Sequence, residues 1–274
     1  MAKDFSRIFT KEDIWAQLEA LNMPRDRVVL MHSSLRLIGN VEGGAKALLD
    51  VLIEYFTEKG GLFCVPTHTW RNLAKDIVLD MNDPTTSLGV FSNIAAADKR
   101  AVRTENPTHS MAVFGNRERA LSFAAGELDV CSGTSPESCY GKIYREGGYI
   151  LLVGVAQNRN TYLHSVEEMI NAPDRLSEEK REVVIKRADG ELVKRMIHTH
   201  RTSYTKDVSQ LFLRYETAFR YHGAITDGFM GNAPVQACDA VIMKETVETI
   251  WERAEGADPL AGSLALPPKW YAVR

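Results

Sequence analysis

The chain has 274 residues, of which 45% are hydrophobic and 25% charged, with a formal net charge of −3. This composition is typical of a globular protein with a sizeable core, and it excludes a disordered or fibrous chain. The slightly negative charge argues against a nucleic-acid-binding surface, which usually carries clustered Lys and Arg. No stretch approaches the roughly 18 apolar residues of a membrane span, and the N-terminus has no apolar signal-peptide segment. We therefore expect a cytoplasmic protein with neither a nucleic-acid partner nor a membrane partner.

The cysteines give no sign of a disulfide framework or a metal site. Cys64, Cys131, Cys139 and Cys238 form no C-x-x-C pair and have no metal-ligand spacing. Cys64 lies in an apolar run, which favours a buried thiol in a reduced protein.

The N-terminal part of the chain begins with a predicted helix and a buried strand. Thr10 can cap the helix, and Asp13 stands three residues on, at the capping-box position. Residues 28–31 (VVLM) form a continuous apolar run, which indicates a strand buried on both faces. Residues 32–44 (HSSLRLIGNVEGG) are small and polar, and we expect them to form a loop.

A second helix is predicted over 45–56, and residues 62–65 (LFCV) read as another buried strand that Pro66 ends. Together with the strand at 28–31 these elements make a β-loop-α-β unit. Its two strands should be parallel and joined by a right-handed crossover.

The later elements repeat this theme and then depart from it. A strand is predicted over 149–155 and a helix over 161–170. Residues 183–197 predict a β-hairpin about Asp189-Gly190, a pair that favours a type I′ turn. A last helix is expected over 245–254. The chain as a whole predicts a single α/β domain over 1–274, with a mixed, mostly parallel sheet sandwiched by helices and one antiparallel extension.

Ligands of open α/β sheets bind beyond the carboxyl ends of the strands. This rule selects three segments, 32–44, 66–70 and 157–168, each of which follows a predicted strand. Residues 107–110 (PTHS) form a further polar cluster, which could line a pocket or cap a strand.

The first of these segments could bind an anion. It ends in Gly43-Gly44 at a predicted helix start, where free backbone N–H groups favour negative charge, and Ser33 and Ser34 add hydroxyl donors. It matches neither common nucleotide-binding motif. The alternative is a tight β-α turn whose serines cap the helix.

The third segment places His164 in the first turn of a helix. Glu167 and Glu168 follow at i+3 and i+4, within side-chain reach of the imidazole. The helix N-terminus disfavours the imidazolium and a carboxylate favours it, so the two effects could hold the pKa of His164 near neutrality, where a general base works best. The alternative is a half-exposed histidine beside two solvated carboxylates.

Two other side-chain arrangements suggest different chemistry. His198 and His200 alternate onto one strand face, but no third metal ligand is evident, and we expect no metal. A hydrolase could use Ser33, Ser34 or Ser110 with His164, but the G-x-S-x-G elbow is absent.

With these segments in hand, the sequence resembles the aminoglycoside 3-N-acetyltransferase (antibiotic N-acetyltransferase) family. The resemblance runs from about residue 10 to 255 and consists of seven blocks in the family's order. They are Met31–Gly44, Val65–Trp70, Asn82–Ser92, Asn106–Gly115, Gly141–Val155, Asn160–Glu168 and Gly228–Ala233.

The resemblance implies transfer of an acetyl group from acetyl-CoA to an amino group of an aminoglycoside or related amino sugar, without a metal. It implies that His164 is the catalytic base, that Glu167 is its orienting or substrate-contacting partner, and that Thr67 lies near the acetyl carbonyl. The block that begins at His32 resembles the part of the family that embraces pantetheine and phosphates. The residues expected to bind acetyl-CoA are His32, Ser33, Ser34, Leu35, Ile38, Gly39 and Ser110.

The acceptor is less defined than the acetyl donor. Arg159 stands where many members of the family have a glycine-rich stretch, and it could repel a polycationic aminoglycoside. A native amino sugar or a cell-envelope intermediate is therefore an alternative acceptor, and a non-catalytic CoA-binding or amino-sugar-binding protein is an alternative of another class. A monomer or a homodimer is expected. The residues expected to contact the acceptor are Trp70, Asp83, Glu137, Glu168 and Asp227.

Overall fold

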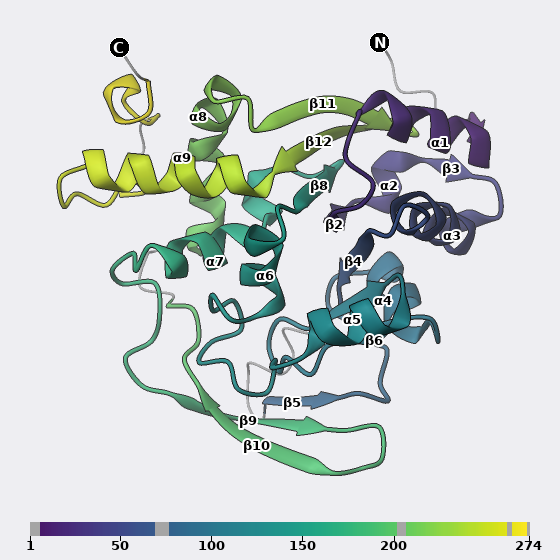
Figure 1. The fold of residues 1–274 in the computed structure, drawn as a ribbon, viewed down its shortest axis with the longest axis horizontal. Helices are drawn as coiled ribbons and strands as arrows, with labels where there is room; N and C mark the ends of the chain where they lie inside the picture. The colour runs from purple at the N-terminus through teal and green to yellow at the C-terminus, as the bar shows by residue number, and fades with distance from the viewer. Residues whose placement is uncertain (1–5, 69–76, 202–206, 262–264, 273–274) are drawn as a thin grey trace.

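A seven-stranded mixed sheet organises the molecule (Figure 1). The computed structural model describes residues 6–68, 77–201, 207–261 and 265–272. The strand order is β11-β12-β8-β2-β4-β7-β6, in which β8, β2 and β4 are parallel and the outer pairs are antiparallel. The mixed α/β fold is thus confirmed, with its parallel part confined to the three central strands. The strands are β2 (Val28–Ser33), β4 (Leu62–Pro66), β6 (Val102–Arg103), β7 (Met111–Phe114), β8 (Tyr149–Val153), β11 (Ile225–Met230) and β12 (Ala233–Asp239).

Helices cover both faces of this sheet, so its central strands are buried on both sides. In β2, Val28 and Leu30 pack into one apolar cluster, while Val29 and Met31 pack into the other. These residues are at most 1% exposed, as expected for a continuous apolar run. On the face of Val29 lie α1 (Lys11–Ala20), α3 (Gly44–Thr57) and α4 (Val90–Ala97). On the face of Val28 lie α5 (Arg117–Ala124), α6 (Cys139–Arg145), α7 (Tyr162–Met169), α8 (Glu216–Tyr221) and α9 (Ala240–Arg253).

Local sequence signals set several element boundaries. Thr10 and Asp13 form the capping box predicted for α1. The last helix starts five residues earlier than predicted, because the carboxylate of Asp239 caps it by accepting from the backbone N–H groups of Val241 and Ile242.

The segment 32–44 is not the loop that its polar composition suggested. It contains the short helix α2 (Leu35–Ile38) and the strand β3 (Asn40–Val41), which pairs in parallel with β1 (Ile8–Phe9). Leu35 and Ile38 turn inward to the apolar cluster on the α1 side of the sheet, which stabilises this extra turn of helix. Cys64 is buried, as predicted, and all four cysteines are free thiols.

A small second sheet lies at the lower end of the molecule in Figure 1. It contains β9 (Arg181–Lys186) and β10 (Leu192–Ile197), which form the predicted hairpin, and β5 (Ile77–Asp80), which adds in parallel to β9. After β10, single bridges join His198 to Ser132 and His200 to Leu176. These bridges carry the chain from the small sheet back toward the main sheet.

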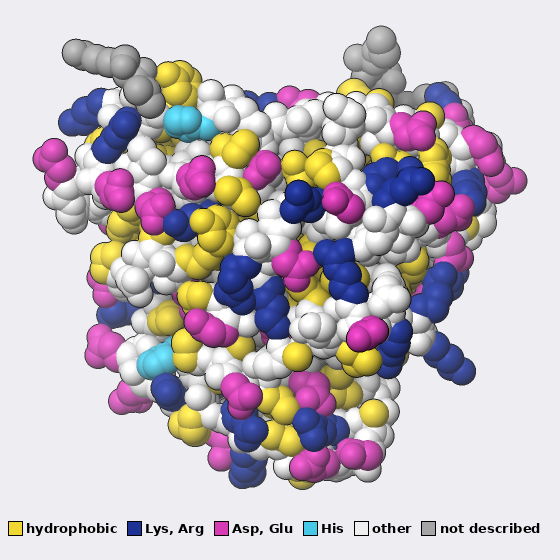
Figure 2. Space-filling view, viewed as in Figure 1, with side chains coloured by type: hydrophobic (Ala, Val, Ile, Leu, Met, Phe, Trp, Pro, Cys, Tyr) yellow, Lys and Arg dark blue, Asp and Glu magenta, His cyan; other side chains and the backbone are white. Residues whose placement is uncertain are grey.

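The described residues also contain the 3₁₀ segments η2 (Gln157–Arg159), η3 (Val208–Tyr215) and η4 (Pro268–Trp270). Acidic and basic side chains are interspersed over the face drawn in Figure 2. Among the described residues, no helix combines the length and apolar character that a membrane crossing requires.

Candidate active site

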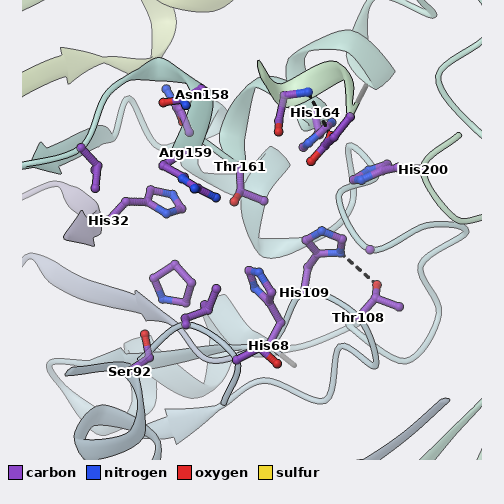
Figure 3. Close-up of a pocket in the computed structure, with 18 of the residues that line it drawn as sticks. His32, His68, Ser92, Thr108, His109, Asn158, Arg159, Thr161, His164 and His200 are labelled. Carbon is purple, nitrogen blue, oxygen red and sulfur yellow. Dashed lines mark hydrogen bonds between the residues drawn. The ribbon is translucent and has the colours of Figure 1, made fainter. Parts of the chain in front are cut away.

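A pocket of about 530 Å³ lies at the carboxyl ends of the three parallel strands (Figure 3). The end of β2 contributes His32 and Ser33, the end of β4 contributes Pro66 and His68, and residues 155–164 after β8 contribute the opposite wall. The three segments selected from the sequence therefore converge, because β2, β4 and β8 run in the same direction. The volume is in the range of small-molecule sites.

His164 lies in the first turn of α7, and its half-buried ring forms part of the pocket wall. The ring stacks on that of His200, with the centroids 4.1 Å apart and the planes at 19°, and it meets the ring of Phe212 edge-on at 4.9 Å. Burial, followed by the positive charges available to His200, Arg175 and His68, holds the pKa of His164 well below its usual value. At neutral pH the imidazole is therefore uncharged, and it has a lone pair to accept a proton.

Glu167 does not face His164 in the way that its spacing suggested. Its buried carboxylate receives a hydrogen bond of 2.7 Å from Nε of Arg175, and Arg175 also forms a two-pronged pair with Asp258 at 2.9 and 3.1 Å. Burial raises the pKa of Glu167 to about 7 in spite of the arginine. Glu167 is paired with Arg175 and so does not offset the effect of the helix N-terminus on the His164 imidazole. The pKa of His164 is lowered, whereas the sequence predicted a value near neutrality.

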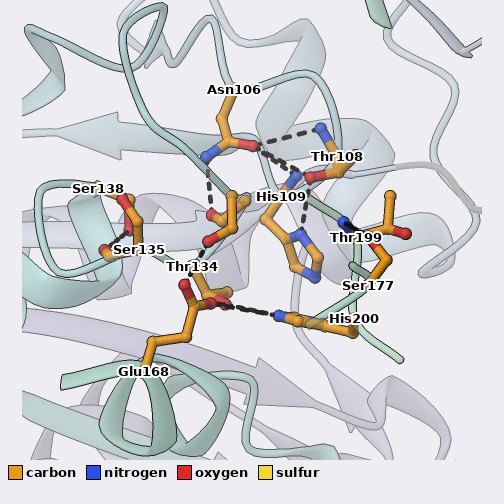
Figure 4. A network of polar contacts seen from close by, with 12 residues as sticks. Asn106, Thr108, His109, Thr134, Ser135, Ser138, Glu168, Ser177, Thr199 and His200 are labelled. Atoms are coloured by element: carbon orange, nitrogen blue, oxygen red, sulfur yellow. Dashed lines mark hydrogen bonds and ion pairs between the residues drawn. The ribbon is translucent and has the colours of Figure 1, made fainter. Parts of the chain in front are cut away.

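Glu168 is not among the residues that line the pocket, and it joins a polar network with Thr134 and His200 (Figure 4). Its carboxylate accepts hydrogen bonds from the hydroxyls of Ser132 and Thr134, the latter at 2.5 Å. The Thr134 hydroxyl is also 2.7 Å from Nε2 of His200, which itself lies 3.5 Å from the Glu168 carboxylate. Glu168 therefore contacts His200 through Thr134, and its carboxylate would stabilise positive charge on the His200 ring.

Most of the histidines in the chain line the pocket, which no single sequence motif predicted. Six of the seven histidines in the chain line it: His32, His68, His109, His164, His198 and His200. Burial lowers the pKa of His32 to about 4 and that of His68 to about 3, so both rings are uncharged at neutral pH. Among the described residues, no three His, Cys, Asp or Glu side chains form a group that could hold a metal ion.

Gly133 is required by a close approach next to this cluster. A Cβ atom at position 133 would lie 2.2 Å from both Nδ1 of His109 and Oγ1 of Thr108, far inside van der Waals contact. Only glycine therefore lets residues 132–134 pass behind the His109 ring, where Oγ1 of Thr108 meets Nδ1 of His109 at 3.0 Å.

The residues predicted to bind acetyl-CoA divide into two groups. His32 and Ser33 line the pocket. Leu35, Ile38 and Gly39 belong to α2 and its C-terminal end, and with Ser34 they lie outside the pocket lining. The fully buried Thr67 and Ser110 bond to each other, with 3.1 Å between their hydroxyl oxygens, and neither lines the pocket. The helix start at Gly43-Gly44 is likewise outside it.

The acidic residues predicted to contact the acceptor do not gather at the pocket. Asp83, Glu137 and Asp227 are exposed and absent from its lining, and Asp227 pairs with Arg220 at 2.6 Å. Trp70 lies outside the described residues. Arg159 instead points into the pocket between His32 and Thr161 (Figure 3), and no ion pair holds it among the described residues. Arg201 and Asp207 also line the pocket, and no sequence motif indicated either of them.

A mixed α/β sheet with a pocket of this size at the carboxyl ends of its parallel strands is the architecture of a small-molecule-binding protein. The chain belongs to the aminoglycoside 3-N-acetyltransferase family, whose family model matches residues 30–252. It is 27% identical over 181 residues to the SPbeta prophage-derived aminoglycoside N(3')-acetyltransferase-like protein YokD of Bacillus subtilis, covering 59% of this chain and 65% of that protein. It is 28% identical over 167 residues to aminoglycoside N(3)-acetyltransferase III of Pseudomonas aeruginosa, covering 54% of this chain and 60% of that protein.

The chain thus spans less than two thirds of the length of these two curated relatives. Among solved structures, a binary complex of AAC-IIIb with CoASH has the same fold, with a TM-score of 0.75 at 20% identity. That likeness covers 92% of this chain and all of the other.

Proposed function

We propose that this protein transfers the acetyl group of acetyl-CoA to an amino group of an aminoglycoside or related amino sugar, with His164 as the general base. The observation that carries the proposal is the position of the His164 imidazole in the wall of the pocket, where burial lowers its pKa, within the region that matches the family. The names of the curated relatives and the CoASH bound to AAC-IIIb support the choice of reaction and cosubstrate. Because acetyl-CoA is a metabolite of the cell interior, the proposal implies a cytoplasmic protein.

The chemistry of amide formation suits a base of this kind. An amine attacks a thioester only through its lone pair, and the nitrogen becomes a strong acid once the new C–N bond forms. An imidazole with a lowered pKa can therefore accept that proton, although it would be a weak base toward a free ammonium group. The thioester is already activated, so no covalent enzyme intermediate and no metal are needed.

The tetrahedral intermediate needs a hydrogen-bond donor for its oxyanion. Thr67 is a poor donor, because its hydroxyl is fully buried and bonded to Ser110. Thr161 precedes His164 by three residues, so the two lie on the same side of the helix start, and both line the pocket. We therefore assign the oxyanion contact to the Thr161 hydroxyl, and the phosphate-side contacts of acetyl-CoA to His32 and Ser33.

The lining of the pocket also supports a second acceptor class, an amino sugar or cell-envelope intermediate with few positive charges. Arg159 and Arg201 are the two cationic side chains of the described lining, and Asp207 is its one carboxylate. A polycationic drug would meet a like charge at the exposed Arg159 side chain that lines the pocket, at a cost that water and salt partly screen. An acceptor that carries one amine, or an amine together with an acid group, would have a smaller repulsion from Arg159 or none.

Release of the CoA thiol from acetyl-CoA, measured across a panel of amines, tests both statements. The panel contains polycationic aminoglycosides, singly charged amino sugars and phosphorylated amino sugars. Acetyl transfer to any of them supports the reaction. The Arg159→Glu variant should improve the polycationic acceptors relative to the others, and an unchanged ratio would contradict the second acceptor class.

Two outcomes would contradict the reaction itself. The first is thiol release that needs no amine, which would indicate hydrolysis. Labelling by a serine-directed fluorophosphonate would then point to the serine hydrolase alternative. The second is tight binding of acetyl-CoA without turnover of any acceptor, which would favour a binding protein.

A further inference from the structure

The histidine pair at 198–200 has no part in the proposed chemistry so far, yet it reaches the proposed base. His200 follows β10 and is fixed by a bridge to Leu176, which brings its ring face to face with that of His164 at 4.1 Å. We propose that His200 is a positioning residue that holds the His164 ring in place and keeps a proton off it, so that the base stays ready to accept one from the acceptor amine. The inference rests on the proposed function for its expected effect on acetyl transfer. Its expected effect on the protonation of His164 does not depend on that function.

The His200 ring is itself positioned by contacts with Thr134 and Glu168 (Figure 4). Thr134 has one hydroxyl proton, and the Glu168 carboxylate, 2.5 Å away, can only accept. The Thr134 oxygen therefore accepts from the other side, and its partner at 2.7 Å is Nε2 of His200, which must carry a hydrogen. This chain of donors fixes both the tautomer and the plane of the His200 ring.

The same chain of hydrogen bonds places a carboxylate next to His200. Nε2 of His200 lies 3.5 Å from the Glu168 carboxylate, whereas Glu167, the other carboxylate on α7, is paired with Arg175. Positive charge on the His200 ring therefore has a carboxylate close by. A proton on His164 would place a second positive charge on a ring whose centroid lies 4.1 Å from that of His200, and repulsion between the two charges disfavours it.

The other groups around His164 act in the same direction. His68, which follows β4, His109, which precedes β7, and Arg175, which follows α7, are all cationic or potentially cationic neighbours. Phe212 of η3 closes the remaining side without charge. Because two stacked rings present their faces to each other and not their N–H edges, His200 cannot take the proton directly from His164. Its effect is electrostatic and steric.

The test is to measure the titration of the His164 imidazole by side-chain nitrogen NMR, with the signal assigned by its loss in His164→Asn. In His200→Phe a flat ring remains but the charge is removed, and in His200→Gln a hydrogen-bond donor to Thr134 remains without the charge. We expect the His164 midpoint to move to higher pH by on the order of one unit or more in both variants. His222→Phe is the matched control, because His222 lies outside the pocket and contacts the carbonyl of Tyr271.

The kinetic readout is the acid limb of kcat/KM for acetyl transfer, which should move to higher pH in His200→Phe and stay in place in His222→Phe. A His164 midpoint that is unchanged or lower in both His200 variants would overturn the inference. The NMR measurement needs no turnover, so it decides the inference even if the protein transfers no acetyl group. Absence of transfer by the wild type would count against the proposed function instead.

Discussion

Replacing Glu167 by Gln tests whether this carboxyl is a buried structural group whose charge is costly. Burial raises the pKa of Glu167 from 4.5 to about 7 in the folded protein. Between these values the folded state binds a proton that the unfolded state has released, so stability is fully present below about pH 4.5 and falls as the pH rises to about 7. At about 1.4 kcal/mol per unit, the loss between pH 5.5 and 8 is about 2 kcal/mol. Glutamine imitates the protonated carboxyl and has no such loss.

The assay is urea unfolding of the wild type and Glu167→Gln at several pH values between 5.5 and 8. The expected result is a stability difference that shifts in favour of the variant by about 2 kcal/mol as the pH rises. The Glu179→Gln variant serves as a control, because that carboxyl is exposed, and its stability curve should run parallel to that of the wild type. If the curves of the wild type and Glu167→Gln are also parallel, the Arg175 pair keeps Glu167 ionised, and the reasoning from burial is refuted.

Two further substitutions test the geometry around the pocket. Gly133→Ala should destabilise the fold by about 1–3 kcal/mol, because its Cβ would lie 2.2 Å from the His109 ring; an unchanged urea midpoint would contradict that close approach. Thr161→Val should lower kcat by about 10²-fold if its hydroxyl contacts the oxyanion, whereas Thr67→Val should leave kcat nearly unchanged, and the reverse order would restore Thr67 to the role expected from the sequence.

Local patterns in the sequence predicted the elements that hold the pocket. The apolar runs at 28–31, 62–65 and 149–155 correspond to β2, β4 and β8, and the rule for parallel strands then brought His32, His68 and His164 to one edge. These features depend on neighbours within a few residues, or on the general topology of a β-α-β unit. The capping signal at Thr10 succeeded for the same reason.

Features that depend on distant residues were missed. Helical spacing predicted that Glu167 and Glu168 would lie within reach of His164, but adjacent helical residues point about 100° apart, and each carboxylate has another partner in the fold. Glu167 pairs with Arg175, which also pairs with Asp258, and Glu168 accepts from Thr134, which also contacts His200. Asp258, Thr134 and His200 are distant in sequence and are brought to these sites only by the complete fold. The cluster of six histidines comes from segments between residues 32 and 200, and the high share of the chain's histidines in the family blocks was the one signal that could have indicated it.

The role of His164 is the claim on which the proposed function depends, and single-turnover acetyl transfer tests it most directly. With enzyme in excess over acetyl-CoA, the rate of the first turnover reports on chemistry without product release. For an acceptor that the wild type acetylates, we predict that His164→Asn and His164→Ala slow this step by about 10²–10⁴-fold while both variants still unfold cooperatively in urea. A first-turnover rate in both variants close to that of the wild type would contradict the assignment of His164 as the base.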